Sequence, residues 1–140
     1  MASKIFLDAN ILLDFTLKRE SYDSAKAVIQ AAVSGLVKAH ITPSIVQMTG
    51  YWLTKAYSSS KAKELLLTLL ADIQVIEITH ELTVTALHSK IADIEDALQY
   101  YTAIHNKIDL FISRDKALKK AAISLLPVYS PEEFLREFGV

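Results

Sequence analysis

The sequence contains no cysteine, and it has only three glycines and three prolines in 140 residues. The absence of cysteine excludes disulfides, thiolate catalysis and zinc sites with cysteine ligands. With so few glycines there is no glycine-rich phosphate-binding loop, because such loops place several glycines close together. The four histidines show none of the paired spacings of metal-binding motifs. Nucleotide-binding motifs are therefore excluded as far as a sequence can exclude them.

Long hydrophobic runs are also missing, since none approaches the ~20 uncharged residues that a membrane span needs. The opening MASKIFLD lacks the apolar region of a signal peptide. A hydrophobic content of 51% and a mean hydropathy of +0.26 are too high for a disordered chain. A net charge of −1 argues against a protein that coats nucleic acid by bulk electrostatics, although local basic groups remain. We therefore expect a soluble, cytoplasmic protein.

Short apolar runs alternate with helical patterns along the chain, which we expect to form one domain over residues 1–140. The runs predict strands at residues 4–7, 37–41, 73–78, 108–112 and 127–129. None of them shows long alternation, so both faces of each strand are expected to be buried, as in a parallel sheet. Helices are expected at residues 22–34, 42–57, 61–71, 82–89, 93–105 and 115–124, and from Ser130 onward. This order predicts a three-layer α/β/α sandwich with a mostly parallel central sheet.

Acidic residues occupy positions where a predicted strand ends or a predicted helix begins. Asp8 and Asp115 follow predicted strands, whose carboxyl ends gather at one crevice of an open α/β sheet. Asp93 and Asp96 lie three residues apart at a helix start, so their side chains are near one face. If Asp8, Asp96 and Asp115 converge, two bare carboxylates ~4 Å apart repel by about 4 kcal/mol at an effective dielectric of 20. Such a cluster needs a proton or a hard cation such as Mg²⁺.

Each of these acidic residues also has an interpretation that needs no metal. Asp8, Asp93 and Asp115 each occupy a position where aspartate often caps a helix, whereas Asp96 has less structural reason to be acidic. Glu95 is expected to point elsewhere. Asp14 is expected to form a surface pair with Lys18, four residues later. The pair Tyr51 and Trp52 and the apolar stretch at residues 65–70 are expected to be buried in the core, with a homodimer surface as the alternative.

Three segments resemble the successive motifs of PIN domains in order and spacing: KIFLDANILLD at residues 4–14, DIEDALQY at 93–100 and ISRD at 112–115. The resemblance covers nearly the whole chain, and DIEDALQYYTA is its most specific part. It implies a metal-dependent ribonuclease fold, often the toxin of a VapC-type toxin–antitoxin pair, with an RNA substrate and an antitoxin partner. It also implies that Mg²⁺ or Mn²⁺ is held by Asp8, Asp96 and Asp115, with Asp93 nearby as a further ligand or base. The supporting polar residues would be Asn10, Ser113, Gln47 and Arg114.

One departure from the family pattern concerns the helix after the second strand. PIN domains commonly carry a further acid there, usually glutamate, yet no Asp or Glu occurs between Asp23 and Glu64. Gln47 and Met48 occupy the corresponding positions, and Gln47 could offer only a neutral carbonyl oxygen. Two functions are therefore carried forward: a metal-dependent endoribonuclease, and a catalytically weak or inactive PIN-like module that binds RNA or protein.

Overall fold

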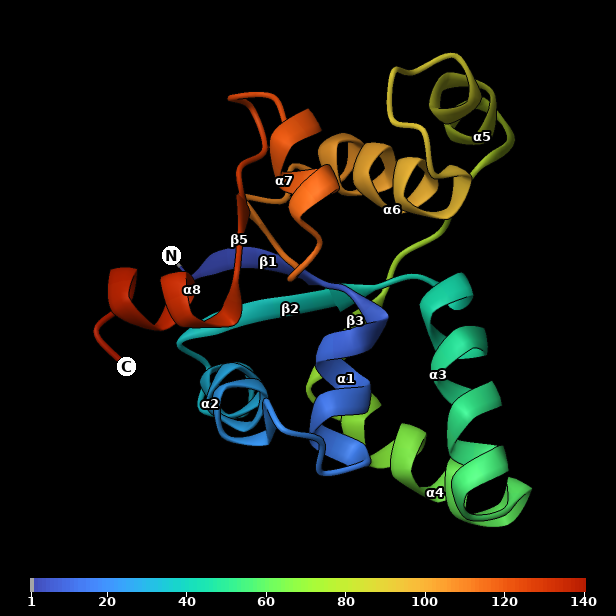
Figure 1. Cartoon of the computed structure of the whole chain (residues 1–140), viewed down its shortest axis with the longest axis vertical. Coiled ribbons are helices and arrows are strands. Elements are labelled where there is room, and N and C mark those ends of the chain that lie inside the picture. The colour runs from blue at the N-terminus through green and yellow to red at the C-terminus, as the bar shows by residue number, and fades with distance from the viewer. Residues whose placement is uncertain (1) are drawn as a thin grey trace.

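The computed structural model describes residues 2–140, and its elements follow the alternating order expected from the sequence (Figure 1). The strands are β1 (Ser3–Leu7), β2 (Val37–Ile41), β3 (Ile73–Val75), β4 (Leu110–Ile112) and β5 (Val128–Tyr129). The helices are α1 (Ala9–Thr16), α2 (Tyr22–Val33), α3 (Pro43–Ala56), α4 (Ser59–Leu70), α5 (His80–Leu87), α6 (Ile94–His105), α7 (Lys116–Ala121) and α8 (Pro131–Glu137). Among residues 2–140, no helix has the length and apolar character needed to cross a membrane.

Within the described residues the strands form one five-stranded sheet in the order β3-β2-β1-β4-β5, and every pairing is parallel. The central strand β1 pairs on both sides, with Ile5 opposite Ala39 of β2 and Leu110 of β4. Helices α6 and α7 lie above the sheet in Figure 1, and α1, α2 and α4 lie below it. The predicted α/β/α sandwich with a parallel sheet is confirmed. Three predicted strands are shorter than expected, because β3 ends at Val75, β4 begins at Leu110 and β5 begins at Val128.

The central strands are buried on both faces, as their lack of alternation predicted. Ile5, Phe6 and Leu7 of β1 are all 0% exposed. Phe6 stacks on Phe111 of β4 with 4.8 Å between ring centroids. Burial of these large side chains from water supplies most of the stabilisation of such a core. The residue that follows β1, Asp8, is therefore attached to the buried central strand of the sheet.

The sheet ladder continues past the strand ends and fixes the backbone there. The Asp8 N–H donates to the Ile112 carbonyl over 3.1 Å, and the Ser113 N–H donates to the Tyr129 carbonyl over 3.0 Å. Asp8 and Ser113 thus lie at the same edge of the sheet, at the carboxyl ends of adjacent strands. This edge is where parallel α/β sheets place their ligands.

A buried polar contact joins the start of α3 to α6. Gln99 is hydrogen-bonded through Oε1 to the Thr42 hydroxyl, and its Nε2 donates to Ser44 Oγ over 3.0 Å. Thr42 also caps α3, since its Oγ1 accepts from the Ile45 N–H over 3.3 Å. Buried amides and hydroxyls that are paired in this way fix the relative position of two elements. The first turn of α3 is consequently held against the second turn of α6.

The aromatic pair on α3 corrects one expectation. Tyr51 is 54% exposed and Trp52 is 49% exposed, so neither is a core residue. They meet edge-on, with ring centroids 5.2 Å apart, and the Lys55 ammonium lies over both rings. In α4, Leu69 is buried as expected, but Leu67 is 70% exposed. The helical period places consecutive residues on different faces, so this apolar stretch serves both core and surface.

Candidate active site

A cavity of about 470 Å³ lies at the carboxyl end of β1 and collects the acidic residues from three parts of the sequence. Its lining comprises Asp8, Ala9, Asn10, Leu13, Met48, Trp52, Asp93, Glu95, Asp96, Arg114 and Asp115. The carboxylates come from the end of β1, the start of α6 and the segment after β4, whereas α3 contributes Met48 and Trp52. Asp8, Asp96 and Asp115 therefore line one cavity, together with two apolar side chains from α3.

Asp8 occupies the N-cap position of α1, yet its carboxylate makes no capping hydrogen bond within the described residues. Instead Oδ2 accepts a hydrogen bond of 2.8 Å from Ser113 Oγ. Ser113 Oγ in turn accepts from the Asp115 N–H over 3.0 Å, so this hydroxyl links two acidic positions. Burial raises the pKa of Asp8, opposed by the Ser113 hydroxyl and the nearby N–H dipole of Ala9. The capping interpretation therefore does not describe the Asp8 side chain.

Asp93 and Asp115 do cap their helices. Asp93 Oδ1 accepts from the Asp96 N–H over 2.9 Å, and Asp115 Oδ1 accepts from the Leu118 N–H over 3.1 Å. Each cap uses one lone pair of a carboxylate that offers about four. Capping and metal binding are consequently compatible at both positions.

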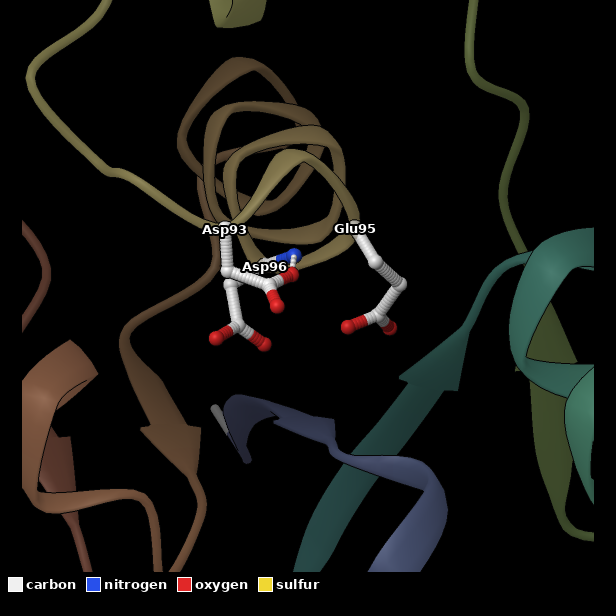
Figure 2. Close-up of side chains that lie close together, drawn as sticks. All are labelled: Asp93, Glu95 and Asp96. Carbon is white, nitrogen blue, oxygen red and sulfur yellow. Dashed lines mark hydrogen bonds between the residues drawn. The ribbon is translucent and has the colours of Figure 1, made fainter.

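Glu95 corrects the expectation that it would point elsewhere. One ligand atom each from Asp93, Glu95 and Asp96 lies within 4.8 Å of the others. Figure 2 shows the three side chains leaving the first turn of α6 on the same side, toward the end of β1. Consecutive helical residues diverge by about 100° around the axis, but the longer glutamate side chain still brings an oxygen within 4.8 Å of its neighbours.

The carboxyl groups at the start of α6 are electrostatically strained. Burial, followed by hydrogen bonds to the Glu95 and Asp115 carboxyls and by their negative surroundings, raises the pKa of Asp96 to about 8. The pKa of Glu95 is also raised, first by burial and then by the charges of Asp8, Asp93 and Asp115, while its contact with Asp96 opposes the shift. Two carboxyl oxygens can share a hydrogen bond only when one of them carries a proton. The raised pKa means that Asp96 favours a bound proton or a nearby cation.

The donor set suits a hard divalent cation. Asp8, Asp93, Glu95, Asp96 and Asp115 line one cavity, and the close oxygens among them are those of Asp93, Glu95 and Asp96. Mg²⁺ and similar ions prefer oxygen ligands. The Oε1 atom of Glu95 is buried without a hydrogen-bond partner anywhere in residues 2–140. A buried acceptor without a donor is costly, by about 1–3 kcal/mol, and a cation would remove that cost. These residues therefore fit Mg²⁺ or Mn²⁺.

The remaining predicted residues are placed differently. Asn10 lines the cavity, but it is exposed and its Oδ1 accepts from Arg19 Nη1 over 3.4 Å. Gln47 is exposed on α3 and does not line the cavity, so the structure does not bring its carbonyl to the carboxylates. Met48, the next residue, faces the cavity instead.

Arg114 lines the cavity, yet its guanidinium is engaged by other helices. Nε lies 3.3 Å from Asp14 Oδ2, Nη1 lies 2.8 Å from Glu132 Oε1, and Nη2 donates to Ser24 Oγ over 2.8 Å. Asp14 is 7% exposed and pairs with Arg114 and Arg19, not with Lys18 as expected. The reason is that α1 ends at Thr16, and Lys18 has a positive φ of 51° outside the helix. Arg114 thus ties α1, α2 and α8 together.

Replacing Arg114 with alanine is expected to lower the free energy of unfolding by about 2 kcal/mol, because it leaves the buried Asp14 carboxylate short of a charged donor. Urea denaturation followed by circular dichroism would measure the change. The matched control is Lys116→Ala, an exposed cation on α7. Unchanged stability combined with a loss of RNA binding in Arg114→Ala would contradict this structural role and support a direct role in substrate binding.

A family model described as PIN domain matches residues 4–117. The chain belongs to the PIN domain family, which confirms the resemblance seen in its sequence motifs. No curated protein shows significant sequence similarity to the chain.

Solved structures share the fold at low sequence identity. VapBC2 from Rickettsia felis, bound to a promoter DNA fragment, aligns with a TM-score of 0.68 and 16% identity over 91% of this chain and 98% of that one. VapC20 from Mycobacterium tuberculosis, a toxin that cleaves the sarcin–ricin loop, aligns with a TM-score of 0.68 and 15% identity over 86% and 97%. A toxin–antitoxin complex from Klebsiella pneumoniae aligns with a TM-score of 0.67 and 21% identity over 91% of this chain and 97% of that one. The fold of this chain is therefore that of the VapC toxins.

Proposed function

We propose that this chain is a cytoplasmic, metal-dependent endoribonuclease that hydrolyses RNA phosphodiesters, and that it is the toxin of a toxin–antitoxin pair. The observation that carries the proposal is the convergence of Asp8, Asp96 and Asp115 on one cavity, where Asp96 needs a proton or a cation to be accommodated. Membership of the PIN domain family supports nuclease chemistry.

The proposed roles follow from the contacts of each residue. Asp8, Asp96 and Asp115 would hold Mg²⁺ or Mn²⁺, and Asp93 would be a further ligand or would orient a water. The bound ion would supply an activated water and offset negative charge on the phosphodiester. Ser113 fixes the Asp8 carboxylate through its 2.8 Å hydrogen bond, and Asn10 stands at the cavity rim as a polar group for substrate or water.

The opposite wall of the cavity suits an RNA substrate. Trp52 is half exposed and lines the same cavity as the carboxylates. Bases of single-stranded RNA stack on exposed aromatic rings, with about 1–3 kcal/mol per base. A phosphodiester beside the carboxylates would then have an adjacent base within reach of the indole ring.

Two neighbours in the structural comparison support partners for the toxin role. The Klebsiella pneumoniae structure is a toxin–antitoxin complex, and the Rickettsia felis structure contains both proteins of its pair on promoter DNA. An antitoxin protein is the partner proposed for this chain. The exposed side chains of Tyr51 and Leu67 also leave a surface on α3 and α4 for a homodimer.

A second candidate function rests on α3. That helix presents Met48 and Trp52 to the cavity and no carboxylate, which favours a catalytically weak or inactive module that binds RNA or protein.

RNA cleavage by the purified chain separates the two functions. Cleavage of a single-stranded RNA that requires added Mg²⁺ or Mn²⁺, stops with EDTA and disappears in Asp8→Ala would support the nuclease. Binding of the same RNA without any cleavage, at every metal concentration tested, would support the inactive module and contradict the proposed activity.

A further inference from the structure

The α3 side of the cavity lacks a carboxylate of its own. No Asp or Glu occurs between Asp23 and Glu64, so neither β2 nor α3 can bring a negative charge to this site. The side chains that α3 presents to the cavity are Met48 and Trp52, which are poor ligands for a hard cation. Any acid that acts on this side must come from another element.

Glu95 is that acid. Figure 2 shows its carboxylate on the side of the β2 strand end and of α3, whereas Asp93 and Asp96 lie on the side of β1 and β4. Glu95 lines the same cavity as Met48 and Trp52. The glutamate side chain therefore spans from α6 into the part of the cavity that α3 leaves without charge.

The Glu95 side chain is half-buried in the cavity. Its Oε1 atom is buried and has no hydrogen-bond partner in the part of the chain that the structure describes. It lies among four further carboxylates, from Asp8, Asp93, Asp96 and Asp115, with which it shares the cavity. A glutamate in a first helical turn has room to extend into water, where its charge would be solvated. Turning inward leaves an unpaired oxygen, which a cation would satisfy.

We propose that Glu95 is a direct ligand of the divalent cation and takes the part of the carboxylate that α3 does not supply. The proposal rests on the metal-dependent function argued above. Oxygens of Asp93, Glu95 and Asp96 lie within 4.8 Å of one another, and ligands across a Mg²⁺ ion lie about 4 Å apart, since each bond is 2.0–2.1 Å long. A small inward movement would bring all three to coordination distance.

Calorimetric titration with Mn²⁺ tests this role. Glu95→Gln keeps the size and polarity of the side chain but removes its charge, and it is expected to weaken Mn²⁺ binding at least tenfold. Glu81→Gln is the matched control, because Glu81 is an exposed acid in the first turn of α5, outside the cavity. Its Mn²⁺ affinity is expected to equal that of the wild type. Thermal unfolding in EDTA would establish that both variants are folded.

A second variant moves the charge to α3. Met48→Glu, introduced into Glu95→Gln, places a carboxylate on the opposite wall of the same cavity and is expected to restore part of the lost Mn²⁺ affinity. Wild-type affinity in Glu95→Gln, with binding lost in Asp96→Asn, would overturn the role of Glu95 and leave the proposed metal site intact. Absence of Mn²⁺ binding in the wild type would overturn the proposed metal-dependent function itself.

Discussion

Replacing Asp96 with asparagine is expected to reduce metal-dependent RNA cleavage by roughly 10²- to 10³-fold, the scale of losing one preorganised electrostatic group. The carboxyl of Asp96 lies between those of Glu95 and Asp115, so it is central to the proposed ion site. Asparagine has nearly the same shape and can donate hydrogen bonds to both neighbours. The variant should therefore fold normally while losing the charge that holds the cation.

The same substitution is expected to change the pH dependence of stability. Asp96 has a pKa of about 8 in the folded chain and 3.8 as an ordinary aspartate. Between these values the unfolded chain has lost the proton that the folded chain keeps, so the free energy of unfolding falls as pH rises. The contribution of Asp96 is thus fully present below about pH 4 and is lost as pH rises through about 8. Asparagine does not titrate, so this part of the pH dependence disappears.

Thermal unfolding in EDTA at pH 6 and pH 8.5 would measure the effect. The Tm of the wild type should fall between these pH values by more than that of Asp96→Asn. Adding Mn²⁺ at pH 8.5 should raise the wild-type Tm and leave the variant unchanged, because a ligand stabilises only a chain that binds it. Wild-type cleavage rates in Asp96→Asn, or equal pH dependence of the two proteins, would contradict the assigned role.

Much of the fold could be predicted because its determinants are local. The apolar runs around Phe6 and Phe111 lack alternation, and both strands are buried on both faces. The helix predicted from Ser130 onward forms behind a capping box, in which Glu133 Oε1 accepts from the Ser130 N–H over 2.9 Å. Strand ends also located Asp8 and Asp115 correctly at one edge of the sheet, because parallel strands share the direction of their carboxyl ends.

The predictions were wrong for residues whose contacts depend on a long, flexible side chain or on a partner far away in the sequence. Helical periodicity assigned Glu95 to another face. The periodicity gives the direction in which a side chain leaves the helix, but it does not give the position of the carboxylate at the end of a flexible glutamate. The sequence did carry one signal for a role of Glu95. No acid occurs between Asp23 and Glu64, so one side of the site has no carboxylate of its own. The pairing of Asp14 with Arg114 joins residues 100 positions apart, for which one sequence carries no local sign.

Replacing Phe111 with alanine is expected to lower the free energy of unfolding by about 3–5 kcal/mol, the usual cost of deleting a buried aromatic ring. Phe111 is 1% exposed and contacts Phe6 and Tyr100, with ring centroids 4.8 and 5.8 Å away. This loss is a large fraction of the 5–15 kcal/mol that typically stabilises a domain. Urea denaturation would measure it, with Leu125→Ala as the control because Leu125 is 68% exposed. A change below about 1 kcal/mol in Phe111→Ala would contradict this account of the core.

Stability lost in the core should be partly recoverable at the metal site. A cation that binds only the folded chain adds about 2.7 kcal/mol of stability at a concentration of 100 Kd. Saturating Mn²⁺ should therefore raise the urea midpoint of Phe111→Ala, and it should fail to do so when Asp96→Asn is added to the same chain. Equal recovery in both proteins would mean that Mn²⁺ acts away from the carboxylates. If Mn²⁺ restores stability only in the chain that retains Asp96, the ion stabilises the weakened core by binding to the carboxylates at the ends of the central strands.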